Sequence, residues 1–109
     1  PRLRKLVREV AKEYGVSYTL MSQIISCESQ GNPTIQSHHR YTASNVPKGY
    51  KVGDREESYG LVQIHVPVHP VTKEQAKDPR FAVDFLAKNI AAGRASMWSC
   101  YSKGMIAMR

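Results

Sequence analysis

The chain has 109 residues, a length that suits one domain with a single hydrophobic core and no need for a metal or many disulfides. Sixteen Lys and Arg against nine Asp and Glu give a formal net charge of +7, which favours a polyanionic partner such as nucleic acid, an anionic membrane surface or an acidic cell-wall polymer. No apolar run is long enough to cross a bilayer or to form a signal-peptide core, so we expect no membrane span and any targeting segment to lie outside this chain.

The start of the chain predicts two helices. Apolar residues at three- and four-residue spacing before Gly15 predict a first amphipathic helix. These residues are Leu3, Leu6, Val7, Val10 and Tyr14. Ser17 or Thr19 is expected to cap a second helix, which ends at Gly31-Asn32-Pro33. Its apolar residues are Leu20, Met21, Ile24, Ile25 and Cys27.

The segment from about Gln30 to Ser58 has a different composition. It is rich in Ser, His, Asn, Gly, Pro and Lys, and it shows no helical period. Because it is long for a structureless loop in a compact domain, we expect a functional rim or a short hairpin. The apolar stretch from Tyr59 to Val66 follows, and Pro67 and Pro70 prevent it from continuing as a helix.

Two further helices are predicted in the second half. Thr72 with Gln75 three residues later is typical of a capping box before a short helix. Asp78-Pro79 predicts the start of a longer helix, with Asp as N-cap and Pro at the first helical position. That helix either ends at Gly93 or continues weakly beyond it. The chain is therefore expected to be mainly helical.

Glu28 is the first candidate for chemistry. On a helix of 3.6 residues per turn it follows Ile24 and Ile25 by one turn, on or beside the apolar stripe. A carboxyl group there would be partly desolvated, which raises its pKa and suits a general acid near neutral pH. The same helix also allows the side chain to bend out to water, so the pattern alone leaves both interpretations open.

Three blocks of sequence resemble a known family. They are Glu28-Ser29 closing a helix, Ser58–Ile64 (SYGLVQI), and Asp78-Pro79 opening a helix that runs to Asn89-Ile90. In this order they resemble the lytic transglycosylase SLT domain and goose-type lysozyme branch of the lysozyme-like superfamily. The resemblance implies an α+β, mainly helical, lysozyme-like fold with a small irregular or β-hairpin lobe. It also implies a single catalytic domain over residues 1–109, either whole or part of a longer protein.

The resemblance assigns roles to individual residues. Glu28 matches the family's single catalytic acid, which protonates the glycosidic oxygen between N-acetylmuramic acid (MurNAc) and N-acetylglucosamine (GlcNAc) in peptidoglycan. Ser29 matches a serine that contacts the sugar site. Gly60, Leu61 and Gln63 match the block that walls the cleft facing the acid.

Other positions depart from the family pattern or extend it. Val62 replaces the usual Met of the wall, and both residues are apolar. Tyr59, beside Gly60, is expected to line the cleft. The family's Ala-Tyr-Asn segment is missing after the Asn-Ile helix; Tyr101 either takes the place of its site tyrosine or packs at the C-terminus.

The mechanism depends on a second carboxylate. With one acid, Glu28 protonates the leaving oxygen and then deprotonates the sugar's own 6-hydroxyl, which gives 1,6-anhydromuramic ends. A muramidase would instead hold a water with a second carboxylate. Asp54 lies in a Gly-Asp-Arg sequence that resembles goose-type lysozymes and is a candidate for that role, but His65 replaces the aspartate expected after the Gln block. We therefore expect a lytic transglycosylase, with a muramidase as the alternative.

A non-catalytic basic module that binds cell wall or nucleic acid is the remaining alternative, although no nucleic-acid motif is present. We expect no cofactor and no metal, since Pro67 between His65 and His69 excludes a helical zinc-binding pair. The expected partner is the glycan strand, bound by a monomer in the periplasm or outside the cell. Cys27 and Cys100 form either one bridge or two buried free thiols, and that location favours the bridge.

Overall fold

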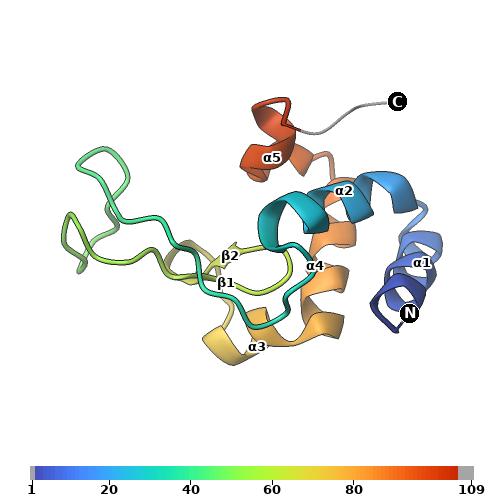
Figure 1. The fold of residues 1–109 in the computed structure, drawn as a ribbon. Coiled ribbons are helices and arrows are strands. Elements are labelled where there is room, and N and C mark those ends of the chain that lie inside the picture. Colours follow the sequence, from blue (N-terminus) through green and yellow to red (C-terminus); the bar gives the residue numbers. More distant parts are fainter. Residues whose placement is uncertain (1, 106–109) are drawn as a thin grey trace.

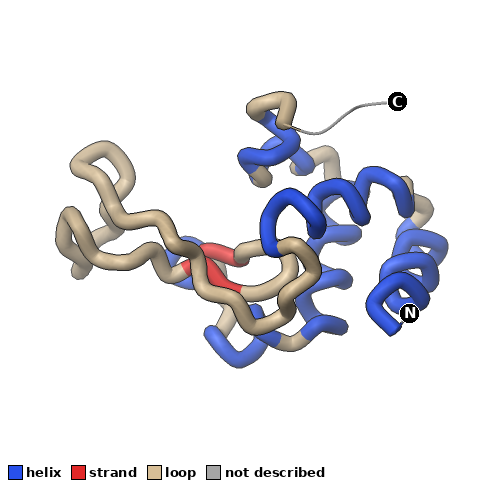
Figure 2. Tube along the Cα trace, in the orientation of Figure 1, coloured by secondary structure: helices blue, strands red, loops and turns tan. Residues whose placement is uncertain are grey.

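The structure, a computed structural model, describes residues 2–105. The elements follow in the order α1 (Arg2–Tyr14), α2 (Tyr18–Ser29), β1 (Ser58–Tyr59), β2 (Ile64–His65), η1 (Val66–Val68), α3 (Lys73–Lys77), α4 (Pro79–Ala91), η2 (Ala95–Met97) and α5 (Ser99–Ser102). The helices gather into one body, and a long loop segment projects away from it (Figure 1). The small sheet lies where that segment meets the body (Figure 2). The prediction of a mainly helical α+β fold is confirmed.

Helix α2 carries Glu28 and is fixed at both ends by local chemistry. Of the two predicted caps, Ser17 is the one used: its hydroxyl accepts a hydrogen bond of 3.0 Å from the backbone N–H of Leu20. The helix stops at Ser29 because Gln30 adopts the left-handed conformation with φ of 54°. The last helical residue therefore lies two positions before the predicted Gly31, and Glu28 remains in the last turn.

Helices α3 and α4 begin as predicted. Thr72 and Gln75 form a reciprocal capping box. The carboxylate of Asp78 accepts a hydrogen bond of 2.9 Å from the N–H of Arg80, and Pro79 occupies the first turn of α4. The helix ends at Ala91, before Gly93, and a 3-10 turn and α5 follow as separate elements. Within residues 2–105, no helix is long and apolar enough to cross a membrane.

One core joins the helical body to the sheet. Helix α1 packs against both α2 and α4, and α2 also contacts α5. The largest fully buried side chains are Val10, Met21, Ile24, Leu61, Val62, Val83 and Leu86. Each such side chain stabilises the fold by about 1.5–3 kcal/mol relative to exposure. Because Leu61 and Val62 belong to this core, the segment after β1 is anchored to the same packing as α2.

The projecting segment is a distorted hairpin, which we call the arm (residues 36–57). Its two sides meet through an isolated bridge between Arg40 and Arg55, and a second isolated bridge joins Gln36, at the base of the arm, to Tyr59 of β1. Both bridges are isolated and do not extend into a continuous ladder, so the arm is irregular along most of its length. The predicted irregular or hairpin lobe is confirmed.

The turn between β1 and β2 requires glycine at its start. Gly60 has a φ of +85°, and a Cβ atom there would lie 1.9 Å from the carbonyl oxygen of Ala76. Gln63, at the other end of the turn, has a φ of 52°. Its side-chain amide donates hydrogen bonds to the carbonyl oxygens of Gly60 (3.0 Å) and Ile35 (3.2 Å), which stabilise this uncommon backbone conformation.

Candidate active site

A cleft of about 580 Å³ opens between the end of α2, the arm, the sheet and the C-terminal segment. The lining residues from α2 and the arm are Cys27, Glu28, Ser37, His39, Arg40, Thr42, Asn45 and Glu56. Those from the sheet and beyond are Ser58, Gln63, Ile64, His65, His69, Phe85, Met97, Trp98, Ser99, Cys100, Lys103 and Met105. The cleft is lined mainly by residues that carry hydrogen-bonding groups, which suits a polar ligand.

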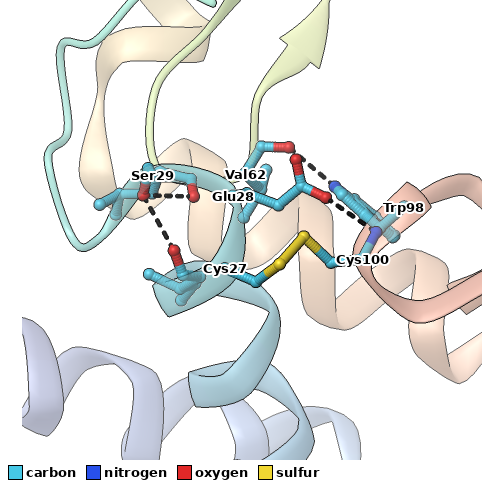
Figure 3. The surroundings of a disulfide bond; sticks show 8 residues. Cys27, Glu28, Ser29, Val62, Trp98 and Cys100 are labelled. Atoms are coloured by element: carbon cyan, nitrogen blue, oxygen red, sulfur yellow. Dashed lines mark hydrogen bonds between the residues drawn. A yellow bond between two sulfur atoms is a disulfide. The ribbon is translucent and has the colours of Figure 1, made fainter. Parts of the chain in front are cut away.

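Glu28 is half-buried in the wall of this cleft (Figure 3). Burial raises the pKa of its carboxyl group above the usual value, and the negative charge of Glu56 acts in the same direction. The backbone N–H of Cys100 donates a hydrogen bond of 3.4 Å to Oε2, which together with the charge of His39 opposes part of that rise. The net effect keeps Glu28 protonated to a higher pH than an exposed glutamate, as a proton donor requires.

Ser29 lies beside Glu28 but outside the cleft, with 4% of its surface exposed. Its hydroxyl oxygen is 2.8 Å from the carbonyl oxygen of Leu61 and 3.1 Å from that of Ile25. It also accepts a hydrogen bond of 3.2 Å from the N–H of Gly31. Ser29 thus joins the end of α2 to the segment after β1 and is not among the residues that line the cleft.

Replacing Ser29 by Ala is expected to lower the free energy of unfolding by about 1–3 kcal/mol, because the buried Leu61 carbonyl loses its partner. KM for the substrate of the cleft should change little, since the hydroxyl does not reach the cleft. Urea unfolding and steady-state kinetics measure the two effects, with Ser26→Ala as an exposed control on the same helix. A large rise in KM with unchanged stability would instead indicate that the hydroxyl contacts the substrate directly.

A disulfide joins Cys27 to Cys100 across 73 residues of sequence. It links the residue before Glu28 to α5, and the N–H of Cys100 contacts the Glu28 carboxylate from the same side (Figure 3). The expected bridge is therefore present, and no described cysteine is a free thiol. The last turn of α2 is held to the C-terminal segment both covalently and by a hydrogen bond.

The wall formed by the Gly60–Ile64 block is held from two sides. Ser29 contacts the Leu61 carbonyl, and the indole Nε1–H of Trp98 donates a hydrogen bond of 2.8 Å to the Val62 carbonyl. Within the block, Gln63 and Ile64 line the cleft, while Leu61 packs in the core. Trp98 is a site residue that sequence reasoning did not single out, because its contact with the Val62 carbonyl joins positions 36 residues apart in the sequence.

Side chains alternate along the strand that leads into the turn, as expected for extended backbone. Glu56 and Ser58 face the cleft, whereas Tyr59 is buried on the other side. The Tyr59 hydroxyl donates to the carboxylate of Glu57, and its ring centroid lies 5.2 Å from the ammonium nitrogen of Lys73. The structure thus does not bring Tyr59 to the cleft.

The other predicted positions also fall outside the cleft wall. Tyr101 is partly buried against the core. Asp54 is exposed in a turn of the arm, where Oδ2 accepts a hydrogen bond of 2.9 Å from the N–H of Lys51. The acid that the arm does bring to the cleft is Glu56. Sequence reasoning missed it because nothing in the arm's composition reveals which residues face inward.

A buried tyrosine, Tyr41, contacts the cleft histidine His65. The Tyr41 hydroxyl accepts a hydrogen bond of 3.0 Å from the N–H of Glu57 and lies 2.8 Å from Nε2 of His65. If the hydroxyl donates its own proton to Nε2, neutral His65 carries its ring proton on Nδ1. In that tautomer the N–H on Nδ1 is available to an acceptor on a ligand in the cleft.

Among residues 2–105, no three His, Cys, Asp or Glu side chains gather in a way that would hold a metal ion. His65 and His69 both line the cleft. Burial lowers the pKa of His69 below its usual value, and His65 adds a smaller effect in the same direction. His69 is therefore suited to hydrogen bonding with a polar ligand as a neutral imidazole.

Comparison with protein families matches residues 5–105 to the transglycosylase SLT domain. The match covers α2, the arm, the sheet, α4 and the segment that carries Trp98 and Cys100. Comparisons with curated proteins and with solved structures found no match.

Proposed function

Since this chain belongs to the transglycosylase SLT domain family, a lysozyme-like family, we propose that it is a lytic transglycosylase that cleaves the MurNAc-GlcNAc β-1,4 bond of peptidoglycan. The observation that supports this most strongly is Glu28: a half-buried acid with a raised pKa, exposed to a polar cleft and held by its neighbours. Such an acid is suited to protonate a poor leaving group near neutral pH.

In the proposed reaction, the Glu28 carboxyl gives its proton to the glycosidic oxygen as the bond from that oxygen to C1 of MurNAc breaks. GlcNAc leaves as an alcohol, and positive charge develops on the MurNAc ring. The Glu28 carboxylate then takes the proton of the C6 hydroxyl, whose oxygen bonds to C1. The product is a 1,6-anhydromuramic end, no water is consumed, and Glu28 regains its proton.

A muramidase is the alternative, and one observation favours it: the cleft contains a second carboxylate, Glu56. In that reaction a water would replace the C6 hydroxyl as the attacking group. Both reactions need Glu28 as the acid, so they differ in the attacking group and in the product.

Digestion of purified peptidoglycan is expected to release fragments with anhydromuramic ends, each lighter by one water than the hydrolysed fragment. Mass spectrometry of the products, before and after borohydride reduction, measures this directly, because reduction changes only hydrolysed ends. Glu28→Gln serves as the control for contaminating activity. Reducing muramic ends as the main product would contradict the transglycosylase and support the muramidase.

We further propose that the partner is the glycan strand and that the domain acts as a monomer outside the cytoplasm. The disulfide supports an oxidising location, and the net charge of +7 suits an anionic wall polymer. A non-catalytic binding module would bind peptidoglycan without releasing any fragment, so the digestion above also tests that alternative.

A further inference from the structure

Glu56 reaches the same cleft as Glu28 from a different element. Glu28 comes from the last turn of α2, and Glu56 comes from the end of the arm, just before β1. The backbone of Glu56 is fixed by two hydrogen bonds: its N–H donates to the His39 carbonyl (2.9 Å), and its carbonyl accepts from Nε2 of Gln36 (3.1 Å). These two hydrogen bonds hold the backbone of Glu56 in place and so restrict the directions that its side chain can take.

The carboxylate of Glu56 is not used within the arm, in contrast to its neighbours. Asp54 accepts a hydrogen bond from the N–H of Lys51, and Glu57 accepts from the Tyr59 hydroxyl and from Gln36. The hydrogen bonds that Glu56 makes to the arm come from its backbone N–H and carbonyl, and its half-buried side chain lines the cleft. Of the acids that precede the sheet, it is the one left available to the cleft.

The charge of Glu56 acts on Glu28 across this space. It raises the pKa of Glu28, because two carboxylates that face one cleft disfavour the state in which both are ionised. The cleft also holds His39, which lowers that pKa, and Arg40, His65, His69 and Lys103.

We propose that Glu56 is a second functional carboxylate of this site, which stabilises the positive charge that develops on the sugar ring as the glycosidic bond breaks. The inference rests on the proposed function and deepens it. The Glu28 carboxyl is donating its proton while positive charge develops on the sugar ring. A second negative charge in the cleft, on Glu56, stabilises the cationic ring at that stage of the reaction.

The test compares the pH dependence of kcat/KM for wild type, Glu56→Gln and Glu56→Asp on purified glycan strands. Glu56→Gln should lower the maximal kcat by about 10- to 100-fold. It should also move the alkaline limb to lower pH: the limb follows deprotonation of Glu28, and loss of the neighbouring charge lowers that pKa. Glu56→Asp keeps the charge and should retain the position of the limb.

Glu74→Gln makes the same change on the exposed surface of α3 and should leave rate and profile unchanged. Circular dichroism and thermal unfolding establish that each variant is folded. The proposal is overturned if folded Glu56→Gln keeps the wild-type rate and profile, or if Asp54→Asn produces the same shift. It is also overturned if Glu56→Gln removes reducing ends alone, since Glu56 would then act on water.

These outcomes are separate from failure of the proposed function. If wild type makes reducing ends, the transglycosylase assignment fails, yet the effect of Glu56→Gln on rate and pH profile still decides the role of Glu56. If wild type cleaves nothing, both fail together.

Discussion

Replacing Glu28 by Gln is expected to lower the rate of glycan cleavage by about 10²- to 10⁴-fold, the usual contribution of a positioned general acid and base. Glutamine keeps the shape and can still accept the Cys100 hydrogen bond of 3.4 Å, but it has no proton to give. Release of soluble fragments from purified peptidoglycan measures the rate. Cleavage at the wild-type rate would show that another group is the acid.

The same variant should be more stable than wild type at neutral pH. The pKa of Glu28 is raised in the folded protein, so its contribution to stability is complete below the unfolded pKa and is lost as pH rises through the folded value. The glutamine of the variant does not titrate, so the difference in free energy of unfolding should grow with pH and vanish in acid. Loss of activity with equal or higher stability at pH 7 separates catalysis from folding.

Replacing Cys27 and Cys100 together by Ala is expected to lower the free energy of unfolding by about 4 kcal/mol. The reason is that the bridge closes a long loop, with 73 residues of separation, and so restricts the unfolded chain. Urea unfolding measures the loss, and wild type unfolded in the presence of a reductant is the matched comparison. An unchanged urea midpoint in both cases would show that packing alone holds α5 to α2.

Local patterns predicted the helical body well. Ser17, Thr72 and Asp78 cap helices as expected because a cap requires residues within three positions of one another. The position of Glu28 beside the apolar stripe was predictable for the same reason: helix geometry repeats over a few residues. Whether the Glu28 side chain faces water or a cleft could not be predicted in this way, since that depends on Trp98 and Cys100, which lie far along the chain.

The arm and the strand faces were not predictable to the same degree. Tyr59 was expected in the cleft, but alternation along β1 depends on register with β2, which no short pattern specifies. Asp54 was named as the candidate second acid because of its Gly-Asp-Arg resemblance, whereas the acid that lines the cleft is Glu56, two positions further on. Ser29 was assigned to sugar contact by resemblance, whereas its hydroxyl is engaged with Leu61.

The proposed location outside the cytoplasm gives the Cys27–Cys100 bridge a role in timing. In a reducing compartment both cysteines stay thiols, so the turn that carries Glu28 and the segment that carries Cys100 are joined only by weaker contacts. Under that proposal, oxidation after export would complete the surroundings of the acid, and the candidate active site would be fully assembled only in the compartment where its proposed substrate lies.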